Sequence, residues 1–339
     1  MCGSKAGARR RCSGGRMDPT ESKERQGQRY ICGMPPVQDA NSAGPLVVNL
    51  LQTLEGHQGA VYDLCLDGQG ALVSAGGDGL LVQWPRNAEA FNSQGKALAK
   101  AGSPVFSLRA LPDGGLEAGT AGGELLTVME DGDWQGEMHH EGGTYVVSAW
   151  GTGGADGRWV SRLSETPETE WRQFEGRIRC ALRGETGVLV GTSEGEIHHV
   201  GAGWKVKAHE GAVRSLLHWP GKAAMASVGG DGRLCIWQAQ ASGKWSCMLS
   251  IDAHKGAAYR ALPSPDGRWV ATCSRDRSIA IWNAETLALA LRIARPVQPG
   301  HMRSVNALCW TSENQLASAG DDGRILIWSL GTDEATSDD

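Results

Sequence analysis

Residues of three types that hydrolases use lie close together in one stretch of the sequence. The segment SVGGDGRLCIW contains Ser227 and Asp231, and His209 lies 18 residues before the serine. When a fold brings them together, a serine, a histidine and an aspartate supply a nucleophile, a base and a group that orients the base. With the glycine-rich turn between them, these residues are the possible parts of a hydrolase site.

The same combination occurs four times along the chain. In each copy an aspartate follows the serine or threonine by four residues, a tryptophan follows the aspartate by six, and a histidine lies 17 or 18 residues upstream. The four sets are His57, Ser74, Asp78 and Trp84; His209, Ser227, Asp231 and Trp237; His254, Thr272, Asp276 and Trp282; and His301, Ser318, Asp322 and Trp328. An enzyme needs one triad, so the repetition favours a structural role over catalysis.

The elements that position these residues repeat with them. Three weaker copies fill the gap between Trp84 and Trp237, with Met129, Arg162 and Val200 at the tryptophan position, so seven units follow one another at intervals of 33 to 46 residues. Each unit contains short alternating apolar runs separated by Gly, Asp, Pro and Asn, and no longer window has a helical period. The sequence therefore predicts an all-β fold of repeated antiparallel sheets.

From about residue 45 to 330 these units resemble WD40 repeats, the G-β-type units that form β-propeller blades. The resemblance implies a seven-bladed propeller in which each set of His, Ser or Thr, Asp and Trp is a structural hydrogen-bond network. One departure is consistent, because each tryptophan is followed by Pro85, Gln238, Asn283 or Ser329 and never by aspartate. The W-D-x-R ending that often marks ubiquitin-ligase adaptors is thus missing, and we do not expect that role.

The resemblance also suggests how the ring closes. The last unit supplies only three strands after Ser304, and the segment PLVVNLLQTL at 45–54 precedes the first Gly-His without a repeat of its own. We expect this N-terminal strand to pair with the last blade and to cover its exposed edge.

Other chemistry has little support in the sequence. No phosphate-binding loop and no H-E-x-x-H motif occurs, and the histidine pairs at 139–140 and 198–199 would point to opposite faces of a strand. We therefore expect no catalytic, cofactor-binding or metal-binding residues and a non-catalytic scaffold that binds a protein or peptide. The alternatives are a hydrolase or small-molecule-binding propeller with its site in the central channel, and a permanent subunit of a larger assembly.

A partner surface is suggested by the position five residues after each histidine. Around the ring it holds Tyr62, Phe106, Tyr145, Arg179, Arg214, Tyr259 and Asn306, which include four of the chain's seven Tyr and Phe residues. Tyrosine and arginine concentrate binding energy at interfaces. Packing between neighbouring blades is the other explanation for these side chains, and the sequence leaves both open.

Further arginines are expected beside the same mouth of the ring. Our candidate partner-binding residues are Tyr62, Arg214, Tyr259, Arg260, Arg275 and Arg303. On an acidic body they would form a basic patch suited to an acidic or phosphorylated peptide. The alternative is a set of solvated arginines at loop tips.

Charge and cysteine content suggest the setting in which the chain works. Residues 1–44 form a basic extension that we expect to be disordered, as we do the acidic tail at 331–339, whereas 45–339 carries 25 basic and 34 acidic residues, a net of −9. We therefore expect that the protein does not bind nucleic acid. Nine cysteines without a C-x-x-C pair, and no long apolar run or signal peptide, predict a cytoplasmic protein that does not bind membranes and is monomeric on its own.

Overall fold

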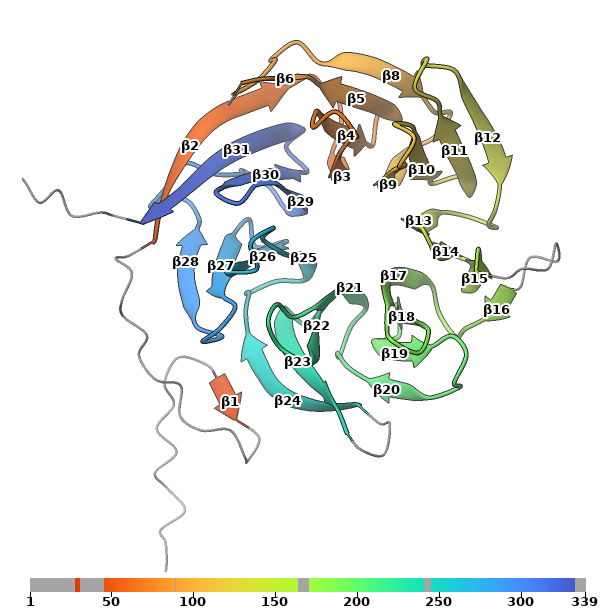
Figure 1. The fold of residues 1–339 in the computed structure, drawn as a ribbon, viewed down its shortest axis with the longest axis vertical. Helices are drawn as coiled ribbons and strands as arrows, with labels where there is room; N and C mark the ends of the chain where they lie inside the picture. The colour runs from red at the N-terminus through yellow and green to blue at the C-terminus, as the bar shows by residue number, and fades with distance from the viewer. Residues whose placement is uncertain (1–27, 31–45, 89, 164–170, 241–244, 333–339) are drawn as a thin grey trace, which may run out of the picture.

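The structure is a computed structural model that describes residues 28–30, 46–88, 90–163, 171–240 and 245–332. All regular elements in these ranges are strands, and apart from one two-stranded hairpin they form seven antiparallel sheets around a central axis (Figure 1). Within this part of the chain no helix is long and apolar enough to cross a membrane. The prediction of an all-β, seven-bladed propeller is confirmed.

The strands of a blade follow one another from the axis outward. Blade 1 contains β3 (Val61–Leu66), β4 (Leu72–Gly76), β5 (Leu80–Trp84) and β8 (Lys96–Lys100), and blade 2 contains β9 (Val105–Ala110), β10 (Leu116–Thr120), β11 (Glu124–Val128) and β12 (Trp134–Met138). Blade 3 contains β13 (Thr144–Ser148), β14 (Gly151–Gly154), β15 (Arg158–Ser161) and β16 (Trp171–Gln173), and blade 4 contains β17 (Ile178–Arg183), β18 (Val188–Thr192), β19 (Glu196–His199) and β20 (Lys205–Lys207).

The second half of the ring is built in the same order. Blade 5 contains β21 (Val213–His218), β22 (Ala224–Gly229), β23 (Arg233–Ala239) and β24 (Trp245–Asp252), and blade 6 contains β25 (Ala258–Pro263), β26 (Trp269–Ser274), β27 (Ile279–Asn283) and β28 (Leu289–Ile293). Blade 7 contains β29 (Val305–Ser312), β30 (Gln315–Gly320), β31 (Arg324–Thr332) and β2 (Leu46–Glu55).

Strand β2 closes the ring, as the sequence predicts. It pairs antiparallel with β31 from Leu46 opposite Thr332 to Glu55 opposite Arg324. The fourth strand of blade 7 thus comes from the N-terminal side of the propeller and the other three from its C-terminal end (Figure 1).

The core of the protein lies between neighbouring blades. The second strand of a blade packs on both faces, so that every residue of β4 and β18 is buried and their apolar runs are nearly continuous. Between blades 1 and 2, for example, Leu81 packs in one cluster with Val105 and Leu126. Each blade is stabilised by its two neighbours, and the set of interfaces becomes complete only when the ring is closed.

Three short strands occur in addition to the four strands predicted for each blade. Strand β1 (Gln28–Tyr30) pairs with β24 at the outer edge of blade 5, so these three residues of the segment expected to be disordered form a strand instead. The long β24 offers them an open edge with unpaired backbone groups. Strands β6 (Arg86–Asn87) and β7 (Ala90–Phe91) form a hairpin between β5 and β8. The rest of 1–44, and 333–339 of the expected tail, lie outside the described residues.

Candidate functional site: the mouth of the central channel

The four repeated sets come together in the way that their spacing suggests. In blade 1 the indole N–H of Trp84 donates to Ser74 Oγ at 2.9 Å, and Ser74 Oγ lies 2.8 Å from His57 Nε2. His57 Nδ1 lies 3.0 Å from Asp78. Blades 5 and 7 repeat this geometry around Ser227 and Ser318. With the imidazole proton on Nδ1, the donors run in one direction from tryptophan to aspartate.

Blade 6 has a variant of the network. His254 Nδ1 bonds to Ser278 Oγ at 3.0 Å, and Ser278 Oγ donates to Asp276 at 2.6 Å. The aspartate itself lies 3.4 Å from the imidazole. The serine is therefore a relay between the histidine and the aspartate that the repeat pattern does not indicate.

The burial of their hydroxyl groups distinguishes these sets from the active site of a hydrolase. The hydroxyl residues Ser74, Ser227, Thr272 and Ser318 are all fully buried. Each hydroxyl oxygen also accepts the indole N–H of its tryptophan. A substrate carbonyl has no path to such a hydroxyl, so the arrangement joins strands of a blade instead of presenting a nucleophile.

The network holds its aspartates in the ionised form. Burial alone would raise the pKa of Asp78, but hydrogen bonds from His57 and from the backbone N–H groups of Leu80 and Gln58 lower it below the ordinary value. The pKa values of Asp231 and Asp322 are lowered by the same balance. Each aspartate therefore ties the histidine to two backbone groups of the adjoining turns.

A fifth set lies in blade 3, where the sequence pattern does not reveal it. His140 Nδ1 lies 3.0 Å from Asp156 and its Nε2 lies 3.0 Å from Thr152 Oγ1. The histidine precedes the threonine by only 12 residues, because two residues alone connect β13 and β14. His140, which we considered only as half of a histidine pair, is thus part of a blade network.

Blades 2 and 4 replace the histidine with other side chains. Before blades 3, 5 and 6 the backbone N–H of the histidine donates to a glycine carbonyl of the preceding blade, as in His140, His209 and His254. Ala101 makes the same bond before blade 2, and Phe174 makes it before blade 4. The ring of Phe174 packs edge-on against His198 at a centroid distance of 5.2 Å. Apolar and aromatic contacts thus take the place of the hydrogen-bond network.

The residues five positions after the histidine share one backbone feature. Each inner strand contains a β-bulge near its start, and in all seven the extra residue without an opposite partner is the one at this position. We call these seven residues the bulge ring: Tyr62, Phe106, Tyr145, Arg179, Arg214, Tyr259 and Asn306. A bulge aims its extra side chain away from the ladder, and bulges are frequent beside functional sites.

The first half of the bulge ring is aromatic. The Tyr62 and Phe106 rings meet edge-on with centroids 5.4 Å apart, and Phe106 stacks on Tyr145 at 5.3 Å. All three are partly exposed. Because they belong to blades 1, 2 and 3, they form one continuous surface across three blades at the mouth of the channel.

The second half of the bulge ring is cationic. The Arg179 guanidinium lies 4.1 Å from the centre of the Tyr145 ring, and that of Arg214 lies 5.4 Å from the centre of the Tyr259 ring. Burial, and then the neighbouring Arg214, lower the pKa of Arg179 to about 10. Asn306 completes the ring by donating to the Asp321 side chain and to the carbonyl of Val61 in blade 1.

Arg260 is not itself a bulge residue. It follows the bulge residue Tyr259 on β25, one position further along the strand, and its side chain forms an ion pair of 3.4 Å with the buried Asp63 of blade 1. The bulge between Ala258 and Arg260 shifts the alternation of side chains on this strand. Its charge thus has a partner within the protein while 37% of the side chain stays exposed, and the assignment of Arg260 to the partner-binding patch stays a prediction.

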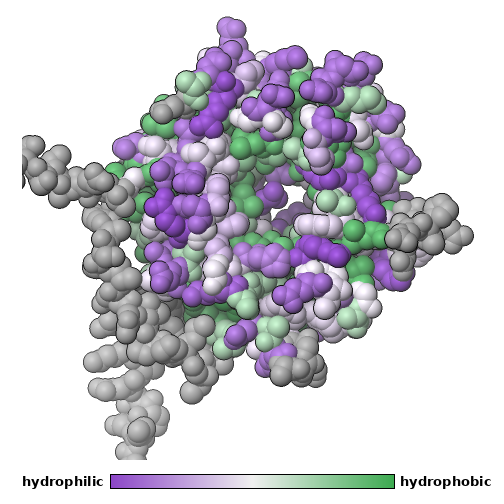
Figure 2. All heavy atoms as spheres, in the orientation of Figure 1, coloured by the Kyte–Doolittle hydropathy of each residue, from purple (hydrophilic) through white to green (hydrophobic). Residues whose placement is uncertain are grey.

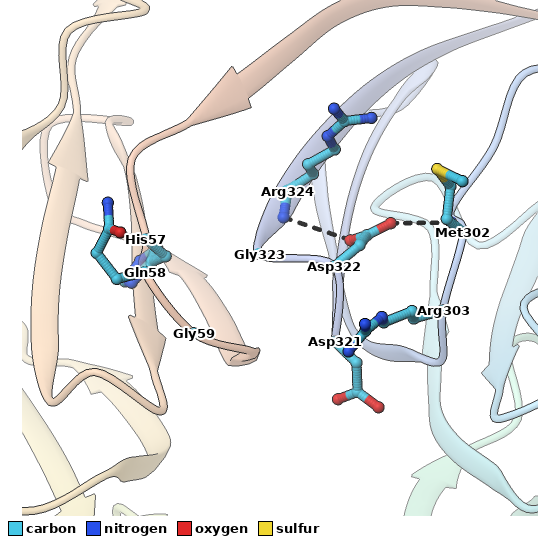
Figure 3. A pocket seen from close by; sticks show the side chains of 9 residues that line it. All are labelled: His57, Gln58, Gly59, Met302, Arg303, Asp321, Asp322, Gly323 and Arg324. Carbon is cyan, nitrogen blue, oxygen red and sulfur yellow. Dashed lines mark hydrogen bonds between the residues drawn. The ribbon is translucent and has the colours of Figure 1, made fainter.

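Arg275 and Arg303 lie in exposed turns of blades 6 and 7. Arg275 precedes the aspartate of its turn, and in blade 7 the equivalent Asp321 bonds to the bulge-ring residue Asn306. Arg303 lines a notch of about 510 Å³ between blades 7 and 1, together with Gln58, Met302 and Arg324 (Figure 3). Asp322 spans the floor of this notch by accepting the N–H groups of Met302 and Arg324.

The centre of the ring stays open, and hydrophilic side chains are visible in the hollow (Figure 2). Cys180 and Cys309 are inner-strand thiols, and burial raises the pKa of each to about 12. Such thiols stay protonated and are poor nucleophiles. Over the ranges that the structure describes, no three His, Cys, Asp or Glu side chains are grouped so that they could hold a metal ion.

Comparison with known proteins agrees with this geometry. The family profile of the WD domain, G-beta repeat, matches residues 48–85, 203–238, 245–283 and 295–329. These ranges hold the four complete sets with tryptophan, in blades 1, 5, 6 and 7. The three blades without a match are those that lack the tryptophan at this position.

Individual relatives are distant and longer than this chain. Rat telomerase protein component 1 is 26% identical over 62% of the chain, which spans 9% of that protein. The WD repeat-containing protein 55 homolog of Drosophila simulans is 28% identical over 33% of the chain and 21% of its own length. The zebrafish p21-activated protein kinase-interacting protein 1-like is 32% identical over 22% of the chain and 19% of its own length. The chain thus spans less than a quarter of each.

Among solved structures, the WD40 β-propeller domain of Doa1 superposes with a TM-score of 0.68 over 84% of this chain and 97% of that domain, at 17% identity. This likeness supports the fold. The four repeat matches and the hydrogen-bond sets of their blades show that this seven-bladed β-propeller contains WD40 repeats.

Proposed function

We propose that this protein is a non-catalytic interaction module that binds a partner protein or peptide on the bulge ring. One observation carries the proposal: seven blades each place one bulge residue at the same mouth of the channel, and Tyr, Phe and Arg occupy six of these seven positions. Their side chains stay partly exposed instead of being buried between blades. Residues of these types dominate the energetics of protein interfaces.

Packing alone accounts less well for the same side chains. The interior between blades is filled by aliphatic residues and by buried tryptophans such as Trp84 and Trp328. Tyr145 and Tyr259 touch the edges of core clusters, yet all seven residues of the bulge ring stay partly exposed, and the aromatic half offers a continuous apolar surface beside Arg179. Such a surface suits a peptide that alternates apolar and acidic groups.

An enzyme with its site in the channel is the rival function. The inner-strand thiols have raised pKa values, Asp63 is engaged by Arg260 and by two backbone N–H groups, and the repeated hydroxyls are fully buried. A carboxylate base or a nucleophile free to act is therefore not evident among the described channel residues. This supports binding over catalysis.

A photo-crosslinking experiment tests the proposed surface. p-Benzoylphenylalanine replaces Phe106 in the bulge ring or, as a control, Trp171, which is 53% exposed on the outer strand β16. Both replacements exchange one aromatic residue for another on a surface. We expect a partner in cells of the source organism to be crosslinked from position 106 and not from 171. Crosslinking from 171 alone would place the interface on the outer wall and refute the proposal.

A further inference from the structure

The tryptophans of the four complete sets share a packing position. Each ring lies against the preceding blade: Trp84 is in one cluster with Ile325 of blade 7, and Trp237 is in one cluster with Ile197 of blade 4. The tryptophans of blades 6 and 7 pack in the same way against blades 5 and 6. At four interfaces of the propeller an indole ring thus fills the space between two blades.

Blade 4 has a valine at the tryptophan position, and a cavity lies beside it. Val200 donates its backbone N–H to Val188, in the pairing that Trp84 has in blade 1, and it packs against the cluster of Trp159 in blade 3. The cavity between blades 3 and 4 has a volume of about 180 Å³. A small side chain in place of a large one leaves such a space. The wall includes Trp159, Leu163 and Arg172 of blade 3 and Arg183, His199 and Val200 of blade 4.

This cavity is remote from the bulge ring. Strand β17 begins at Ile178, next to the bulge residue Arg179, and it ends at Arg183 in the wall of the cavity. The cavity therefore lies at the opposite end of the blades from the mouth of the channel. A ligand bound there would leave the bulge ring free for a partner.

His199 holds part of the wall in place. Its Nδ1 accepts the backbone N–H groups of Gly201 at 3.1 Å and Ala202 at 2.9 Å, and its Nε2–H donates to Thr186 Oγ1 at 3.1 Å. These bonds connect the turn after β19 to the hairpin between β17 and β18. Burial lowers the pKa of His199, so its ring is neutral at neutral pH. The wall is thus fixed before a ligand arrives, which reduces the cost of binding.

The cavity has an apolar interior and a cationic rim. Trp159 is fully buried and Val200 is partly buried, whereas Arg172 and Arg183 are exposed. Asp and Glu are absent from the described residues that line the cavity. A ligand that matches both parts has an apolar group to bury and one negative charge to leave at the rim.

We propose that this cavity binds a small, planar aromatic carboxylate. The ring would occupy the space that an indole fills at four other interfaces, and the carboxylate would lie at the rim with Arg172 and Arg183. A dry cavity of about 150 Å³ accepts benzene, so this one has room for one or two fused rings. Guanidinium groups match the planar fork of a carboxylate and strengthen its hydrogen bonds.

The test uses the full-length protein and three probes that separate ring from charge. Indole-3-propionate carries both, indole-3-propionamide has the same shape without the charge, and acetate has the charge without the ring. Binding is measured by NMR titration at constant ionic strength for the parent protein, Val200→Trp, Arg183→Gln and the control Arg303→Gln. The control removes one charge from the notch at the mouth of the channel.

We expect saturable binding of indole-3-propionate to the parent protein and to Arg303→Gln with equal affinity. Binding should be about tenfold weaker to Arg183→Gln and undetectable for Val200→Trp, whose own ring fills the cavity. The amide and acetate should bind at least tenfold more weakly than indole-3-propionate. Absence of binding to the parent protein, or equal affinity for the amide, would overturn the inference.

Thermal unfolding checks that Val200→Trp acts by filling the cavity. Its midpoint should be equal to or above that of the parent protein, because the new ring gains packing contacts at an interface that lacks them. Unchanged binding of indole-3-propionate to a folded Val200→Trp would place the site elsewhere and refute the proposal. If this variant does not fold, the comparison of Arg183→Gln with Arg303→Gln and of the acid with its amide still decides.

Discussion

Arg260 of blade 6 and Asp63 of blade 1 form an ion pair of 3.4 Å although blade 7 stands between their blades. The residue of blade 7 at the same inner-strand position is Ala307, which is too small to block the approach. Asp63 also accepts the backbone N–H groups of Leu64 and of Leu108 in blade 2. One carboxylate therefore connects three blades inside the channel.

This ion pair predicts that replacing Asp63 and replacing Arg260 will lower the free energy of unfolding by different amounts. Asp63→Ala leaves two buried N–H groups without an acceptor and should lower the free energy of unfolding by about 2 kcal/mol or more. Arg260→Met should cost less than about 1 kcal/mol, because the arginine side chain is 37% exposed and its pair is screened by water. Urea unfolding of both variants and of the double variant checks this order. A larger loss for Arg260→Met would contradict it.

The fifth hydrogen-bond set predicts that blade 3 depends on His140. His140→Ala should lower the free energy of unfolding by about 1–3 kcal/mol, since Thr152 and Asp156 then lose their buried partner. The adjacent His139 is less buried and makes a longer contact of 3.3 Å with Thr152, so His139→Ala should cost clearly less. The two variants are compared by chemical denaturation, and equal losses would argue against a blade network at His140.

Stability should fall on acidification in two ranges of pH. Burial lowers the pKa of His140 and His254, so the unfolded chain binds their protons first and stability decreases as pH falls below about 6.5. Asp78, Asp231 and Asp322 have lowered pKa values, so their contribution is present above about 3.9 and is lost as pH falls through the folded-state values. Urea unfolding from pH 8 to 3 gives the profile, and His254→Asn should flatten its upper range.

Arg277 has a backbone conformation that the other blades give to glycine. Its φ is 71°, and the six equivalent residues are all glycines with φ between 74° and 97°: Gly79, Gly123, Gly157, Gly195, Gly232 and Gly323. A left-handed conformation costs a residue with a Cβ about 1–2 kcal/mol, and glycine costs about 0.5–1 kcal/mol of chain entropy. Arg277→Gly should therefore raise the free energy of unfolding slightly, whereas Arg277→Ala keeps the strain. A loss of stability in Arg277→Gly would mean that the side chain makes a stabilising contact.

The fold could be predicted from the sequence because the most regular spacings lie within single hairpins. The Asp-to-Trp step of six residues falls within one hairpin of each blade, and it holds in four blades whatever the length of their loops. His140 escaped the pattern because the short β13–β14 connection changes its distance to Thr152. The spacing of a pair within a hairpin can be read from a sequence, but a spacing that includes a loop varies with the loop.

The residues of the bulge ring could be predicted from the sequence, but the β-bulges that contain them could not. Counting from the histidine identifies the seven positions, yet nothing in the residue types indicates a bulge at each. The bulge decides that Tyr259 lies at the mouth and that Arg260 turns inward to Asp63.

The closure of blade 7 by β2 also sets an order of events during synthesis. Strand β2 leaves the ribosome early, but its partner β31 ends at Thr332, after all the other strands of the ring. Until then the edge of β2 and the adjoining face of blade 1 have no native partner, because blade 7 does not yet exist. A nascent chain must therefore keep this apolar face from other contacts until the other six blades and β31 have been made, and the ring closes only with that strand.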